Sequence, residues 1–149
     1  MIASLLIIVV STVLLIYWFR YVCLLILRTQ TARDYASGLA AANSLKYPDV
    51  QGRLLQDAPA TELPALQKSL EADYVLLTYL LQHTVGLEVG GITVEQRMLM
   101  LDFKVMRLFC ALSRRLAVPQ ARAALAEMSS ILKHLANAMG ERVQSSSRA

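Results

Sequence analysis

The sequence predicts an all-α protein in which a single transmembrane helix is followed by a small, cytoplasmic, antiparallel bundle of three to four helices. Two observations carry this prediction. Residues 2–19 form an uncharged apolar run, and three later segments repeat apolar residues at steps of three and four. The 149 residues suffice for one hydrophobic core, and the hydrophobic content of 56% exceeds the value usual for soluble domains.

The apolar run at residues 2–19 is long enough to cross a membrane. Eighteen helical residues rise about 27 Å, and the hydrocarbon core of a bilayer is roughly 30 Å thick. A single arginine follows among aromatic side chains, a composition typical of the headgroup interface. We therefore expect a membrane-interface cluster of Tyr17, Trp18, Phe19, Arg20 and Tyr21. An alternative holds Arg20 inside the bilayer against a carboxylate of another subunit.

The flanks of this run predict a retained anchor, residues 1–28, with a defined orientation. No basic side chain precedes the run, and it ends in aromatic residues rather than in the small residues of a signal-peptide cleavage site. Arg20, Arg28 and Arg33 all follow it, so the positive-inside rule predicts an inner (cytoplasmic) membrane protein whose C-terminal domain is cytoplasmic. The two cysteines are then expected to be reduced.

The next two segments differ in their content of helix-breaking residues. Residues 29–45 lack proline and place apolar residues at helical spacing, which predicts a juxtamembrane helix. This helix either stands alone or extends the anchor as one long stalk. Residues 46–61 contain Pro48, Gly52 and Pro59, and we expect them to form a linker.

Residues 62–143 are predicted to form the bundle, with helices at about 62–85, 94–116 and 119–140 and a frayed tail at 144–149. Short connections make consecutive helices antiparallel neighbours. The hairpin before the middle helix is marked by Gly86, Gly90 and Gly91, and Thr93 and Gln96 match the pattern of a capping box at its start. The stripes expected in the core are Leu63, Leu66, Leu70, Tyr74, Leu77 and Leu81 in the first helix and Ala121, Leu125, Met128, Leu132, Leu135 and Met139 in the third.

The middle helix is apolar on two nearly opposite sides. The stripe expected in the core is Val94, Met98, Leu101, Val105, Leu108 and Leu112. The stripe expected to bind a partner is Leu99, Phe103, Met106 and Cys110. A helix that is apolar on two sides is either central in its bundle or shared with another chain. The alternative is therefore that the juxtamembrane helix packs on the second stripe and completes a four-helix bundle.

A row of basic residues lies between these stripes. It consists of Arg97, Lys104, Arg107, Arg114 and Arg115, and we call it the basic row. We expect it to help bind a partner or anionic lipid, and its alternative is a solvated face whose stems cover apolar neighbours. Nucleic acid is not expected as a partner, because the charges lack both density and interleaved exposed aromatic residues.

The chain carries few of the residue patterns that chemistry requires. His83 and His134 are its only histidines, and neither has carboxylates at metal-ligand spacing. Asp73 and Asp102 lie within apolar helices and are expected to pair with Arg or Lys of a neighbouring helix. The sequence contains no phosphate-binding glycine loop before a helix and no nucleophile motif. We therefore expect no catalytic residue, metal or cofactor.

These patterns favour a non-catalytic accessory or scaffold subunit that docks on other subunits of an integral membrane protein complex. The alternative is a membrane-tethered adaptor or regulator. It would recruit a soluble cytoplasmic partner or anionic lipid through the basic and apolar faces of the middle helix.

Overall fold

The structure, a computed structural model, describes residues 1–29, 34–84 and 91–148. Within these ranges the chain is all-helical, as predicted, and has no strand. The six helices are α1 (Ile2–Arg28), α2 (Ala36–Asn43), α3 (Tyr47–Leu55), α4 (Leu63–Thr84), α5 (Val94–Leu116) and α6 (Val118–Arg148). The chain divides into two compact units, Met1–Gln30 and Thr31–Ala149. Arg33, Gly86 and Gly90 lie outside the described residues.

The first unit is the helix α1. It has 27 residues, and an 18-residue window within it has a mean hydropathy of 2.5, so it is long and apolar enough to cross a membrane. The helix continues without interruption past Arg20 and ends at Arg28, where Thr29 has the extended conformation. A stalk running from the anchor through residue 45 is therefore not formed.

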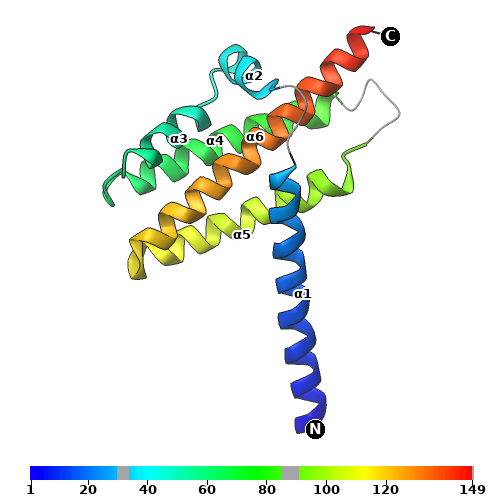
Figure 1. Cartoon of the computed structure of the whole chain (residues 1–149), viewed down its shortest axis with the longest axis vertical. Coiled ribbons are helices and arrows are strands. Elements are labelled where there is room, and N and C mark those ends of the chain that lie inside the picture. The colour runs from blue at the N-terminus through cyan, green and yellow to red at the C-terminus, as the bar shows by residue number, and fades with distance from the viewer. Residues whose placement is uncertain (30–33, 85–90, 149) are drawn as a thin grey trace. The chain divides into compact units, whose positions relative to one another are not determined.

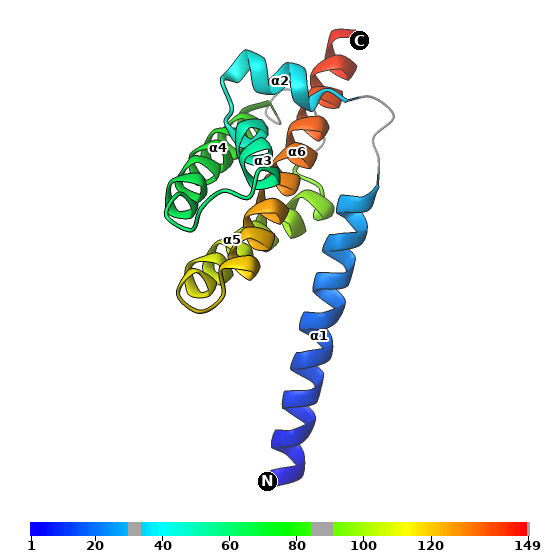
Figure 2. The same ribbon diagram turned by 60° about the vertical axis from the view of Figure 1, so that its left-hand side comes forward.

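The second unit is built around α6. This helix packs against α2, α3, α4 and α5, while α3 also contacts α4 and α2 (Figures 1 and 2). It is also longer than expected, since residues 144–148, predicted to be frayed, continue the helix. The juxtamembrane helix shortens to α2 and packs on α6 and α3 rather than on α5.

The segment expected to be a linker, 46–61, contains a helix of its own. Pro48 stands at the start of α3, where proline is tolerated because the first amides of a helix have no partner within it. Two of these amides, of Lys46 and Tyr47, donate to one carboxylate oxygen of Asp73 on α4, both at 2.7 Å. A side chain distant in sequence therefore completes the start of α3.

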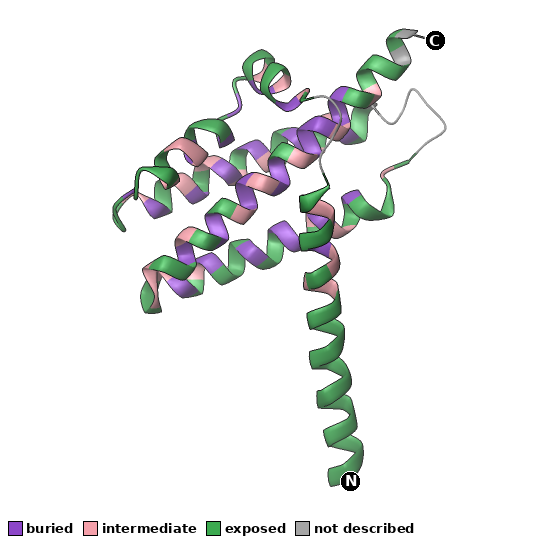
Figure 3. Ribbon diagram, viewed as in Figure 1, coloured by how far each residue is buried: buried purple, intermediate pink, exposed green. Residues whose placement is uncertain are grey.

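The core follows the predicted stripes in two of the three long helices. All six predicted positions of α6 are buried, and those of α4 are buried or half-buried. In α5 the prediction is wrong. Figure 3 shows α5 buried along one side and exposed along the other, and the two apolar stripes have exchanged the roles expected for them.

Candidate interaction surface on helix α5

The start of α5 is fixed by a complete capping box. The Oγ1 of Thr93 accepts from the amide of Gln96 at 3.3 Å, and the Oε1 of Gln96 accepts from the amide of Thr93 at 3.2 Å. The predicted cap is confirmed. Arg142 of α6 adds a contact, because its guanidinium donates to the same Gln96 oxygen at 3.0 Å. The first turn of α5 is thereby tied to the far part of α6.

The stripe predicted to bind a partner lies instead in the core. Leu99, Phe103, Met106 and Cys110 are all buried, with only 1% of Phe103 exposed. The Phe103 ring stacks on Tyr74 of α4 with ring centroids 4.3 Å apart and planes nearly parallel. The expectation that these four residues form a contact surface is therefore wrong.

The close approach of α5 to α6 explains this choice of face. A single residue, Ala117, separates the two helices, so they meet immediately after the turn. Near that turn the inner face of α5 carries Cys110 and Ser113, both small and both buried. The Cys110 thiol lies 3.8 Å from the carbonyl oxygen of Ala121, a spacing that a leucine at this position would prevent. The stripe containing Leu108 and Leu112 is too bulky for this seam.

The opposite side of α5 is left as an exposed apolar stripe, defined as Val94, Leu101, Val105, Leu108, Leu112 and Leu116. Leu101 is 53% exposed and Leu108 64%. Phe109 lies beside this stripe and is also exposed. The expectation that this side forms the core is wrong, and truncating Leu101 should cost far less than truncating a core leucine.

The basic row borders the exposed apolar stripe along one flank of α5. At about 100° per residue, all five cations fall between the buried side and the exposed apolar side. Arg97, Lys104, Arg107 and Arg115 are exposed, and Arg114 is half-buried. The basic row therefore adjoins the exposed apolar stripe. The other stripe, which was expected to bind a partner together with the row, is buried.

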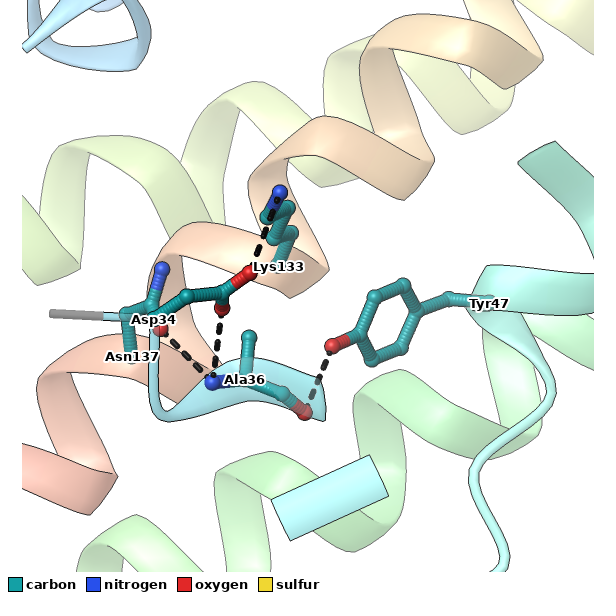
Figure 4. Close-up of polar contacts among 5 residues, drawn as sticks. All are labelled: Asp34, Ala36, Tyr47, Lys133 and Asn137. Carbon is teal, nitrogen blue, oxygen red and sulfur yellow. Dashed lines mark hydrogen bonds and ion pairs between the residues drawn. The ribbon is translucent and has the colours of Figure 1, made fainter. Parts of the chain in front are cut away.

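The opposite side of the bundle is held by polar contacts. Asp34, Tyr35 and Ala36, here called the entry segment, are the residues that lead into α2. The Ala36 amide donates to Oδ1 of Asn137 at 2.7 Å and to Oδ1 of Asp34 at 3.1 Å, and the Lys133 ammonium lies 3.7 Å from Asp34 (Figure 4). Asn137 and Lys133 lie one turn apart on α6. The entry segment is thereby fastened to α6.

Three further contacts complete this attachment. The Tyr47 hydroxyl donates to the Ala36 carbonyl at 3.0 Å, and the Tyr35 hydroxyl pairs with Oε1 of Gln144 at 2.8 Å. Gly140 lies directly under Tyr35, so close that an added Cβ would clash with the tyrosine Cβ. Burial, with Asp34 and Asp73 nearby, raises the pKa of Tyr47 to about 12.

The residues considered for chemistry are dispersed. Burial lowers the pKa of His134, and the His83 ring packs at a tilt against Tyr79 on α4. Burial also raises the pKa of Asp73, which binds backbone amides of α3 rather than the predicted Arg or Lys. The described residues contain no group of three His, Cys, Asp or Glu side chains able to hold a metal ion. Both cysteines are free thiols.

One open groove of about 430 Å³ lies between α3 and α6. Leu54 and Leu55 line it from α3, and Ala123 and Ala126 from α6. At one end Arg122 pairs with Asp57 at 3.3 Å and donates to the Ala58 carbonyl at 2.8 Å. Sequence reasoning missed this groove because it assigned the α3 residues to a linker.

In comparisons with known proteins, no family model, no curated protein and no solved structure matches the chain.

Proposed function

We propose that the protein is a single-pass, non-catalytic accessory or scaffold subunit of a larger membrane protein complex. In this proposal α1 anchors the chain in the inner (cytoplasmic) membrane and the bundle lies in the cytoplasm. The apolar length of α1 supports the anchor, and Arg20 and Arg28 near its C-terminal end support the orientation.

The observation that carries the proposal is the exposed apolar stripe of α5. Four of its members, Leu101, Val105, Leu108 and Leu112, follow one another along the helix at steps of three and four. Contiguous apolar surface of this kind is costly in water and marks contact sites in soluble domains. The basic row beside it provides the charged border that interface cores commonly have. The stripe is therefore the docking surface for an integral partner.

Co-purification tests this docking. Leu101→Ser, Leu108→Ser and Leu112→Ser together should abolish stoichiometric recovery of partner subunits after gentle detergent extraction, measured by native mass analysis. Their exposure means that the bundle should keep its thermal stability. The matched control is Val75→Ser with Tyr79→Ser, which removes exposed apolar side chains from α4 and should leave recovery unchanged.

Two results would reject the docking proposal. One is unchanged recovery of the partner subunits in the α5 triple variant. The other is an equal loss of recovery and of thermal stability, which would assign the stripe to folding rather than to docking.

The orientation needs its own measurement. A reporter fused to the C-terminus and active only in the cytoplasm should give signal, whereas one active only outside the cytoplasm should not. The opposite pattern, or a mature chain that lacks its first twenty or so residues, would contradict the anchored arrangement.

A further inference from the structure

The net positive charge of the protein lies in two helices, α1 and α5. The whole chain carries a net charge of +4. Five cations and two carboxylates lie in α5, and two cations with no carboxylate lie in α1. These two helices therefore hold +5, and all the remaining residues together hold −1. The bundle outside α5 has no positive excess.

Three cations of the bundle outside α5 form ion pairs. Among the described residues, Arg53 pairs with Glu62, Arg122 with Asp57 and Lys133 with Asp34. None of these three cations belongs to the basic row. Four of the five members are exposed, so their charge is presented to the surroundings rather than neutralised within the fold.

We propose that the basic row of α5 binds acidic phospholipid headgroups of the membrane that holds α1. The inference rests on the proposed anchor, but not on the partner docked by the exposed apolar stripe. Lysine and arginine at a membrane surface are attracted by the negative potential of acidic lipids, and their stems can lie along apolar surface while their charges reach the phosphates.

The short connection between the two helical units favours lipid over a free acidic protein. Only seven residues, 29–35, separate α1 from α2, and seven residues span at most roughly 25 Å when fully extended. Headgroups are therefore available to every anchored copy at high effective concentration. A symmetric contact between the α5 helices of two copies would instead bring like charges together.

Lysine reactivity provides a test on the intact full-length protein. The chain has four lysines, of which Lys104 alone belongs to the basic row. The protein is reconstituted into vesicles of phosphatidylcholine, with or without phosphatidylglycerol in both leaflets, so that orientation does not matter. An uncharged acetylating reagent is added, and each lysine is followed by mass spectrometry.

Lys104 should react about threefold more slowly in the acidic vesicles, because the surface potential raises the local proton concentration by roughly that factor. Lys68, on α4, should react equally in both vesicles. The difference at Lys104 should vanish at roughly 1 M salt, where the Debye length falls to about 3 Å.

Charge reversal at the neighbours of Lys104 sharpens the test. Arg97→Glu with Arg115→Glu keeps Lys104 itself and should remove its dependence on acidic lipid. The control, Lys46→Glu with Arg53→Glu, makes the same change in net charge outside α5 and should retain the slow reaction of Lys104.

Two results would overturn the proposal. Equal Lys104 rates in both vesicles would show that acidic lipid is not bound. Protection of Lys104 that grows with protein density would assign the row to a second copy or another protein. Release of the protein from vesicles by carbonate would instead defeat the proposed anchor.

Discussion

The two sides of α6 are held by different kinds of contact. On one side α5 meets α6 along an apolar seam that ends in Cys110 and Ser113. On the other side the entry segment meets α6 through hydrogen bonds, one ion pair and a glycine. The seam requires apolar side chains of suitable size, whereas the polar side requires particular hydrogen-bonding residues at particular positions.

The largest expected effect is on the apolar seam. Phe103→Ala should lower the free energy of unfolding by about 3–5 kcal/mol, because it removes a fully buried ring and its stacking on Tyr74. Phe109→Ala, on the opposite side of the same helix, should cost under about 1 kcal/mol. Denaturant unfolding of both full-length variants in detergent measures the difference. Equal losses would mean that α5 is rotated from the position described.

The next effect is a pH dependence on the polar side. Because burial raises the pKa of Tyr47 to about 12, the folded protein holds the phenol proton more tightly than the unfolded chain, whose pKa is near 10. The contribution of the protonated Tyr47 phenol to the free energy of unfolding is fully present below about pH 10. It should fall by about 2 kcal/mol as the pH rises from 10 to 12. Unfolding of the wild type and of Tyr47→Phe across this range measures it. A steeper fall in the variant than in the wild type would contradict it.

A somewhat smaller effect concerns the glycine on the polar side. Alanine usually stabilises a helix relative to glycine by up to about 1 kcal/mol, but Gly140→Ala should destabilise by about 1–2 kcal/mol because the new Cβ clashes with Tyr35. Gly52→Ala in α3 meets nothing within 4 Å and should be neutral or stabilising. Thermal melting of the two variants compares them. A stabilising Gly140→Ala would show that Tyr35 does not need this close approach.

The smallest effect is at the N-terminal cap of α5. Thr93→Ala should cost about 1 kcal/mol, because the amide of Gln96 loses its acceptor. Thr93→Ser keeps the acceptor oxygen and should cost only a fraction of this. If both variants melt alike, the cap contributes nothing measurable to α5.

Periodicity predicted the helices and their apolar stripes, but it could not show which of the two stripes of α5 faces the core. In α6 the single stripe from Ala121 to Met139 left no choice, and the prediction is confirmed. In α5 the choice depends on the turn at Ala117, where small residues must face α6. The stripe richer in leucine and valine suggested the wrong side. Hydrophobicity indicates which side chains favour burial, but it does not indicate how closely two helices approach.

The polar side of α6 was not predictable in the same way. Its contacts join residues about one hundred positions apart, as between Ala36 and Asn137, and each looks ordinary in its local sequence. Asp73 shows why the partner of a buried acid is hard to predict from sequence. A buried acid was expected to meet a cation, but the backbone amides of α3 satisfy it equally well and leave no trace in the pattern of side chains.

The attachment of the entry segment has a mechanical consequence. A pulling force along the chain from α1 reaches the bundle at Asp34. The hydrogen bond and the ion pair of the entry segment transfer this force to α6 before α2 is loaded. Since α6 contacts every other helix of the bundle, the load is shared by the whole unit and no single short helix is peeled away. The bundle is therefore expected to respond as one body to a pull at its entry segment.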